Sequence, residues 1–242
     1  MITCERTGDV GVVSIDRHQR RNALDAEHCD ALRHAVETAV EAGARAVVLT
    51  GRGTTFSAGA DLDGVYDESF RRSLYAMLHG VADCPVPTIA AVNGPAIGAG
   101  TQLAVACDLR VAATSAVLAV PTARQGLAVD PWTVRRLAEL AGGGTARALM
   151  IGGERIDVHL AHHRGLVDRI GGLEEAIGWA REIAGFAPLS LRYAKQALHG
   201  LLELAEPSSD LDAEFERCWH SEDLVEGRRA RQEKRQPRFQ GR

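Results

Sequence analysis

The sequence predicts an α/β fold with a sheet that is at least partly parallel. The first observation is a strand, helix, strand order, in which apolar strands at 10–15 and 46–50 flank a helical pattern over 25–41. The second is a pair of loops rich in small residues, each directly after an apolar strand. With 242 residues, 45% of them hydrophobic, the chain can bury a sizeable core as one large domain, or as one domain with a helical appendix.

Composition excludes several classes of partner and site. A formal net charge of -4 gives no general attraction to nucleic acid or to anionic lipid. The five cysteines are odd in number and widely spaced, which indicates free thiols in a reducing compartment. The pair His162-His163 lacks the spacing of a metal-binding helix, so we assign no metal. With neither a signal-like start nor an apolar run approaching about 18 residues, the protein is expected to be cytoplasmic and soluble, without membrane insertion.

The first part of the chain carries a hairpin, a basic loop and a capped helix. Residues 2–15 alternate as two strands around Thr7-Gly8-Asp9. Four of the five residues from Arg17 to Arg21 are Arg or His, a set that could hold phosphate groups or simply form a solvated loop. Asp25 is expected to cap a helix that runs to about Glu41, and a buried strand follows at 46–50.

Two loops of small residues then follow two buried strands. The first spans 51–62, and the second, 93–102, lies between the strand 87–92 and a short helix expected over 103–107. Each loop can present a backbone N–H group, and a pair of such groups is what a thioester carbonyl needs as it becomes an enolate. A helix expected over 66–81 would wall the pocket for the acyl group.

The remainder is predicted to be mostly helical scaffold, with a basic tail. Expected elements are a helix after Asp130-Pro131 that ends at the glycines 142–144, a strand at 166–170, helices over 173–186 and 189–204, and one last amphipathic helix marked by Leu211, Phe215, Trp219 and Leu224. The tail 228–242 carries seven cations and one glutamate, which by default indicates a solvated segment.

Several segments together resemble the crotonase, or enoyl-CoA hydratase/isomerase, family. They are Arg21-Asn22-Ala23-Leu24 and residues 56–62, 93–100 and 107–112, with Gly165-Leu166-Val167-Asp168 and residues 234–239 extending the resemblance over nearly the whole chain. The resemblance implies a core of repeated strand, strand, helix turns over 1–185 and a C-terminal helical trimerisation region over 186–242. It also implies a homotrimer or a dimer of trimers.

By motif position, the resemblance implies that the N–H groups of Ala60 and Ala99 hold the oxygen of a coenzyme A thioester. Coenzyme A enters as part of the substrate, so no separate cofactor is expected. Nor is nucleic acid expected as a partner, because the helix over 25–41 is acidic overall. The residues expected to contact the acyl-CoA are Ala23, Leu24, Ala58, Asp61, Leu62, Gly98, Gln102, Thr122 and Trp132.

The two glutamates of the family's hydratases are replaced. Their positions hold Gln102, three residues after the second N–H donor, and Thr122, after Pro121. Neither an amide nor a threonine hydroxyl titrates near neutral pH, so neither can transfer protons in the addition of water. Two hypotheses follow: an enzyme of fatty acyl-CoA metabolism in which hydratase activity is doubtful, and a non-catalytic fatty acyl-CoA binding or delivery protein.

Asp130 is the one carboxylate that we nominate for chemistry. In the isomerase and dehalogenase branches of the family, an aspartate at the matching place acts as base or nucleophile, so a one-carboxylate isomerase is a further alternative. The structural interpretation is that Asp130 caps the following helix, with Pro131 at the first helical position. One residue can do both.

Overall fold

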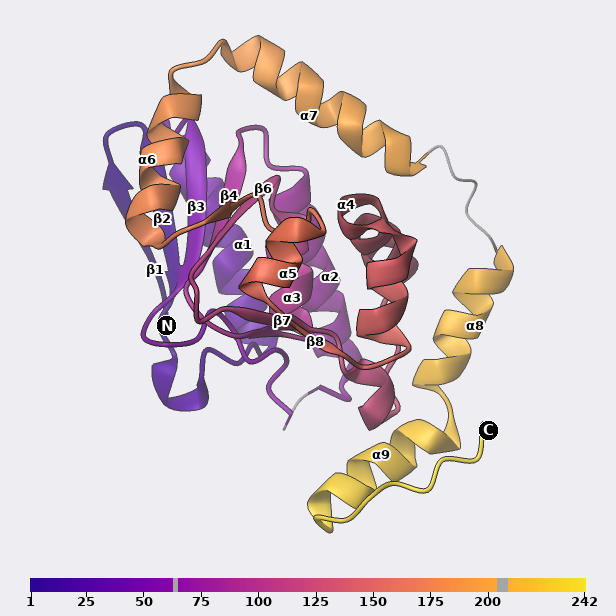
Figure 1. Ribbon diagram of the computed structural model, residues 1–242. Coiled ribbons are helices and arrows are strands. Elements are labelled where there is room, and N and C mark those ends of the chain that lie inside the picture. Colours follow the sequence, from indigo (N-terminus) through magenta and orange to yellow (C-terminus); the bar gives the residue numbers. More distant parts are fainter. Residues whose placement is uncertain (63–64, 204–208) are drawn as a thin grey trace.

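The computed structural model describes residues 1–62, 65–203 and 209–242, and its main sheet runs through the left half of Figure 1. Within the described part of this sheet, only β1 is antiparallel to its neighbour, so the predicted α/β class with a largely parallel sheet is confirmed. The six strands, in spatial order, are β1 (Ile2–Thr7), β2 (Val10–Ile15), β3 (Ala46–Gly51), β4 (Thr88–Val92), β6 (Leu109–Ala112) and β9 (Arg169–Ile170).

A second, three-stranded sheet includes a short strand within the second small-residue loop. Its strands are β5 (Ala96–Ile97), β7 (Val117–Ala119) and β8 (Arg155–Asp157). Isolated parallel bridges join Ser57 to Ala96 and Leu24 to Ala60, next to this sheet. Successive turns therefore add one strand to each sheet before a helix, which is the repeated strand, strand, helix core that the family resemblance implies.

Helices cover both faces of the main sheet. The side chains of β2, β3, β4 and β6 alternate between two hydrophobic clusters, as a sheet buried on both faces requires. One face packs against α1 (Ala26–Glu41) and α3 (Ala99–Ala106), and α2 (Glu68–Ala82) packs on these two helices. The other face packs against α6 (Leu173–Ala184). The predicted Asp25 cap is confirmed, because its Oδ1 accepts the His28 N–H at 2.9 Å.

A buried ion pair joins two of the segments that carry the family resemblance. Arg110 on β6 is 1% exposed, and its Nη2 lies 3.0 Å from Oδ2 of Asp168. The same guanidinium donates to the carbonyls of Leu166 and Cys107, each at 2.9 Å. Burial lowers the pKa of Arg110, so Asp168 and the two carbonyls supply the contacts that keep a charged guanidinium in the core.

The C-terminal region consists of helices that reach away from the sheets. After α4 (Pro131–Met150), which is kinked at Gly142, and α5 (Val158–His163) come α7 (Pro188–Glu203), α8 (Ser209–Trp219) and α9 (Glu222–Gln232). The expectation of one last amphipathic helix is wrong: Ser221 accepts the N–H of Leu224 and starts α9 as a separate helix. In Figure 1, α7 crosses above the body while α8 and α9 descend beside α4.

The described residues contain neither a membrane-spanning helix nor a metal-binding cluster. Over the ranges that the structure covers, no helix combines the length and the apolar composition needed to cross a bilayer. The same ranges hold no cluster of three side chains suited to binding a metal ion.

Candidate functional site

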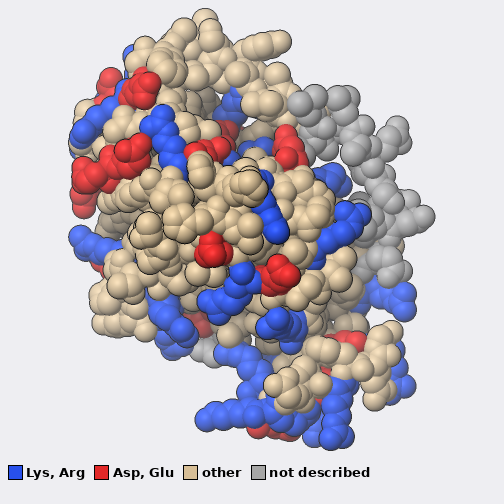
Figure 2. Space-filling view, viewed as in Figure 1, with Lys and Arg blue, Asp and Glu red and all other residues tan. Residues whose placement is uncertain are grey.

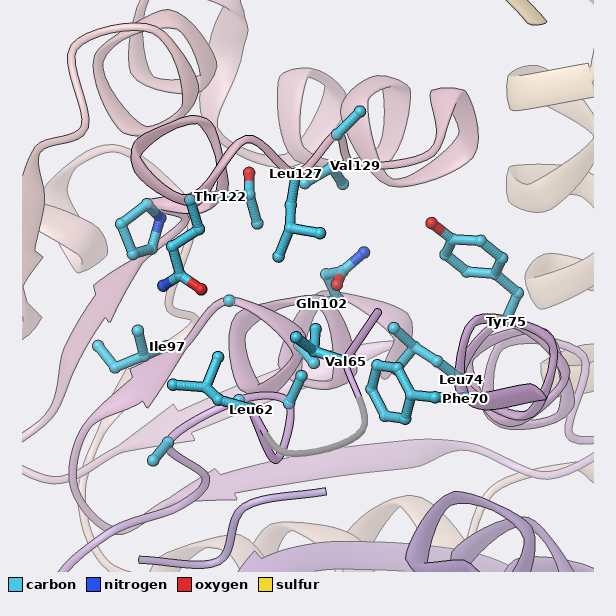
Figure 3. Close-up of a pocket in the computed structure, with 18 of the residues that line it drawn as sticks. Leu62, Val65, Phe70, Leu74, Tyr75, Ile97, Gln102, Thr122, Leu127 and Val129 are labelled. Atoms are coloured by element: carbon cyan, nitrogen blue, oxygen red, sulfur yellow. The ribbon is translucent and has the colours of Figure 1, made fainter. Parts of the chain in front are cut away.

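A cavity opens where both small-residue loops meet α2 and the segment that follows β7. It is walled by Leu62 and Ala60 from the first loop, Gly98 and Ala99 from the second, and Leu74 and Tyr75 from α2. Figure 3 shows Gln102 near the centre of the cavity. Thr122, Leu127 and Val129 lie across the cavity from Leu62 and Leu74. The helix expected over 66–81 begins later, at Glu68, and supplies part of this wall.

In the first loop, the N–H of Ala60 points away from Leu24, the residue with which Ala60 pairs. Leu24 donates to the Gly59 carbonyl at 2.8 Å and accepts from the Asp61 N–H at 2.5 Å. In such a parallel bridge the flanking residues make both hydrogen bonds, so the N–H of Ala60 points to the other side. That N–H has no acceptor among the residues that the structure describes.

The second loop ends in a helix whose first residue is Ala99. The helix expected over 103–107 starts four residues earlier, and the first hydrogen bond within it runs from the Gln102 N–H to the Gly98 carbonyl. The N–H of Ala99 therefore belongs to the first turn and has no partner in the helix, nor any elsewhere in the described chain. Ala60 and Ala99 both line the cavity.

Close backbone packing holds the loops in this arrangement. The Ile97 N–H donates to the Ser57 carbonyl at 3.0 Å, and a Cβ on Gly100 would lie 2.4 Å from that oxygen. The Ser57 hydroxyl is fully buried and donates to the Asn22 carbonyl at 2.8 Å, so it is a structural group. The Asn22 amide in turn donates to the carbonyls of Thr55 and Arg52, which fixes the segment 21–24 to the first loop.

Gln102, which lines the cavity, forms a buried polar network with Asp130. The Gln102 Nε2 lies 3.3 Å from Oδ2 of Asp130 and 3.2 Å from the Thr133 hydroxyl. Asp130 accepts the Thr133 N–H at 3.0 Å and its hydroxyl at 2.6 Å, so the predicted cap of α4 is confirmed. Asp130 does not itself line the cavity. Its carboxylate is directed at the cap and at Gln102.

The described wall of the cavity carries amides and hydroxyls but no carboxylate and no histidine. Gln102 and Thr122, the replacements for the hydratase glutamates, both line it. Burial, together with the nearby charge of Asp130, raises the pKa of the Tyr75 phenol, which therefore stays protonated near neutral pH. The described wall thus offers hydrogen bonds but no group that exchanges a proton near pH 7.

The other predicted contact residues fall into two sets. Besides the residues already described, Ala58 lines the cavity. Ala23, Leu24 and Asp61 do not line it. Trp132 points elsewhere, because its ring packs on that of His79 at 5.2 Å between centroids. Trp132 is the second residue of α4, after Pro131, and its ring faces α2.

One cation of the basic loop, Arg17, contacts other residues of the protein. The Arg17 guanidinium contacts Oδ2 of Asp61 at 2.7 Å and Oδ2 of Asp25 at 3.2 Å. It also donates to the Ala23 carbonyl at 3.0 Å. Arg17 thereby ties the loop to the start of α1 and to the first small-residue loop.

Sequence reasoning missed the residues that close the cavity from α8 and from the segment 127–129. Trp219 lines the cavity, and its ring lies 5.1 Å below the Arg71 guanidinium, which also pairs with Glu216 at 3.0 Å. Leu127 and Val129 line the cavity from the segment 127–129. The amphipathic pattern of α8 gave a signal for Trp219, but not which apolar surface it would cover.

The basic tail contacts the first small-residue loop, although most of its side chains are exposed. In Figure 1, α9 lies at the lower edge of the molecule. Figure 2, drawn from the same side, shows Lys and Arg side chains gathered there. Arg231 donates to the Leu62 carbonyl at 3.1 Å, and Arg228 lies 5.6 Å from the ring of Tyr66. A Cβ on Gly227 would lie 2.3 Å from the Gln125 carbonyl, so α9 approaches the segment beside Thr122 closely. Arg235 forms ion pairs with Glu226 and Glu233.

Comparison with known proteins gives consistent results. The family described as enoyl-CoA hydratase/isomerase matches residues 5–242. A Mycobacterium tuberculosis protein named "Probable enoyl-CoA hydratase echA6" is 44% identical over 245 aligned residues, which cover 100% of both chains. The crystal structure of carnitinyl-CoA hydratase from Mycobacterium avium is 33% identical, with a TM-score of 0.87 over 100% of this chain and 98% of that one. Methylmalonyl-CoA decarboxylase, at 24% identity and a TM-score of 0.91 over 100% and 98% of the two chains, shares the fold.

Proposed function

Because the chain belongs to the crotonase, or enoyl-CoA hydratase/isomerase, family, we propose that it binds a fatty acyl-CoA thioester without hydrating it. Proteins of this family belong to acyl-CoA metabolism. One observation carries the proposal. The described wall of the cavity presents two unpaired backbone N–H groups, from Ala60 and Ala99, and no carboxylate.

The thioester oxygen accepts hydrogen bonds from both N–H groups. Each such bond contributes about 0.5–1.5 kcal/mol, and more when the oxygen gains negative charge. The acyl chain lies against the apolar wall that includes Phe70, Leu74 and Leu127. Each methylene group that leaves water adds about 0.8 kcal/mol, so chain burial supplies much of the affinity.

The coenzyme A moiety lies along the outer edge of the first loop. Ala23, Leu24, Ala58, Asp61 and Leu62 are the residues that we assign to this edge, and no separate cofactor is needed. The contact between Arg231 and the Leu62 carbonyl supports a role for α9 in holding a phosphate group of coenzyme A.

Hydration lacks its proton-transferring groups. Removing one general acid or base typically costs about 10² to 10⁴ in rate, and here Gln102 and Thr122 replace both. The name of the mycobacterial relative includes hydratase activity, but we do not extend that activity to this chain.

The one-carboxylate isomerase is the weaker alternative. A base must reach the proton that it removes. The Asp130 carboxylate accepts the hydroxyl and N–H of Thr133 and the Gln102 amide, and it does not line the cavity. We therefore assign it a positioning role.

The oligomer that we propose is a homotrimer or a dimer of trimers, with contacts through the helical region 186–242. The boundary follows α6, which ends at Ala184. On α7, Leu189 is 76% exposed and Tyr193 is 74% exposed. An apolar face of this size on one helix suits burial against a second copy of the chain.

The binding proposal is tested by thermal unfolding with a saturated long-chain acyl-CoA and with free coenzyme A. At a concentration of one hundred times the dissociation constant, a ligand that binds only the folded state adds about 2.7 kcal/mol of stability. For a domain of this size that is a rise of about 5–10 °C in the midpoint. We expect the acyl-CoA to give this rise and free coenzyme A to give much less. Equal shifts for the two ligands would show that the cavity does not bind the acyl chain.

A further inference from the structure

The side chain of Trp219 lies at one end of the cavity. Figure 3 shows Tyr75 on the opposite side of the cavity from Leu62 and Ile97. On α8, the ring of Phe215 packs on the Tyr75 ring at 6.2 Å between centroids and on the Trp219 ring at 6.3 Å. Trp219 itself lines the cavity. The indole therefore lies at the Tyr75 end, away from the two small-residue loops.

This end of the cavity is the one that an acyl chain reaches last. The N–H groups proposed for the thioester oxygen belong to Ala60 and Ala99, which come from the small-residue loops at the other end. Figure 3 places the apolar side chain of Leu74 between Leu62 and Tyr75. A chain that leaves the thioester carbon therefore passes Leu74 before it meets the indole.

The indole is held by its neighbours and not by a hydrogen bond. Its Nε1 atom is buried and has no hydrogen-bond partner among the residues that the structure describes. The Arg71 guanidinium lies 5.1 Å from the centroid of the Trp219 ring, a position in which a cation is attracted by the ring face. Glu216 fixes Arg71 in turn, because both of its carboxylate oxygens accept from Nη1, at 3.1 and 3.0 Å. Without the guanidinium, the indole can turn without breaking a hydrogen bond.

A large, rigid ring at the end of an apolar cavity makes affinity depend on chain length. Every pair of methylene groups that leaves water raises affinity about tenfold. This gain stops at the length at which the chain meets Trp219, because a packed interior does not accept extra atoms without strain. A longer chain must displace the indole or leave its last carbons in water.

We propose that Trp219, positioned by Arg71, sets the longest acyl chain that the cavity buries. This inference rests on the proposed function, since it concerns the same cavity and the same thioester. Trp219 determines specificity by direct contact with the end of the chain. Arg71 is a positioning residue, which acts through the indole.

The test measures dissociation constants by calorimetry for saturated acyl-CoA thioesters of four to sixteen carbons, in steps of two carbons. For the wild-type protein, we expect affinity to rise about tenfold with each step and then to level off at one length. Trp219→Ala frees the space of the indole, so the rise should continue for at least one further step, while chains too short to reach the indole bind as before. Phe215→Leu is the matched control. It changes the neighbouring ring on α8, which does not line the cavity, and should keep the wild-type limit.

Two substitutions of Arg71 test its positioning role. Arg71→Met keeps an apolar stem but removes the cation, so the indole is free to move, and we expect the limit to shift to longer chains as in Trp219→Ala. Arg71→Lys retains a cation over the ring and should keep the wild-type limit. Thermal unfolding without ligand checks that both variants are folded. An unchanged limit in folded Arg71→Met overturns the positioning role.

The outcomes separate this inference from the function on which it rests. Affinity that levels off at the same length in the wild-type protein and in Trp219→Ala overturns the limit set by Trp219, while acyl-CoA binding stands. Affinity that rises through the whole series in the wild-type protein overturns it too. So does an equal loss of affinity at every chain length in Trp219→Ala, which would mean that α8 only supports the fold. Failure of every acyl-CoA to bind more tightly than free coenzyme A overturns both.

Discussion

Ala99→Pro is expected to weaken acyl-CoA binding about tenfold to a hundredfold, because the buried thioester oxygen loses one of its two donors. Ala99 is the first residue of α3, and its N–H makes no hydrogen bond within the helix. Proline fits this first position without breaking a helical hydrogen bond, so the fold should persist. The proline ring also occupies the place of the missing hydrogen.

Calorimetric titration with a saturated long-chain acyl-CoA measures this effect. Ala99→Ser is the matched control, since it changes the side chain but keeps the N–H, and it should bind nearly as the wild-type protein does. Thermal unfolding without ligand checks that both variants are folded. A folded Ala99→Pro protein with unchanged affinity would show that this N–H does not hold the thioester.

Asp168→Ala is expected to lower the free energy of unfolding by about 3–5 kcal/mol, because it leaves a buried guanidinium without its carboxylate. Arg110 is 1% exposed, and Asp168 is its one ion-pair partner within the described residues. The Arg110 backbone N–H also donates to the same carboxylate oxygen at 2.7 Å. The loss therefore affects both β6 and the segment before β9.

Urea unfolding of single and double variants measures this cost. Asp168→Ala combined with Arg110→Met removes both charges, and we expect it to be more stable than Asp168→Ala alone. Arg169→Ala, next in sequence but 40% exposed in its side chain, is the control and should cost little. A cost for Asp168→Ala below about 1 kcal/mol would mean that solvent reaches the guanidinium.

Local patterns in the sequence predicted much of the fold. The caps at Asp25 and Asp130 followed from a side-chain oxygen placed directly before an apolar helical pattern, and both are present. α3 starts four residues before the position that the sequence predicts, because the stretch from Ala99 to Gln102 resembles a glycine-rich loop. Helical geometry there is stabilised by packing against Ser57, which no local pattern reveals.

The sequence predicts which residues belong to the site better than it predicts how they are arranged. Trp132 and Trp219 are both aromatic residues on amphipathic helices, yet only Trp219 lines the cavity. The difference depends on how α4 and α8 pack against α2, and hydrophobic periodicity does not contain that information. Similarly, the sequence nominated Asp130 for both a cap and chemistry, and only its distance to Gln102 identifies it as the residue that orients an amide.

The central claim, that the cavity binds acyl-CoA but does not hydrate it, is tested most directly by an assay of trans-2-enoyl-CoA hydration. The second protein in the assay carries Gln102→Glu and Thr122→Glu together with Asp130→Asn. The third change is needed because a carboxylate at position 102 would otherwise lie beside that of Asp130 and raise the pKa of the pair. We predict no turnover above background by the wild-type protein, with measurable hydration restored in the triple variant. Robust turnover by the wild-type protein would contradict the account.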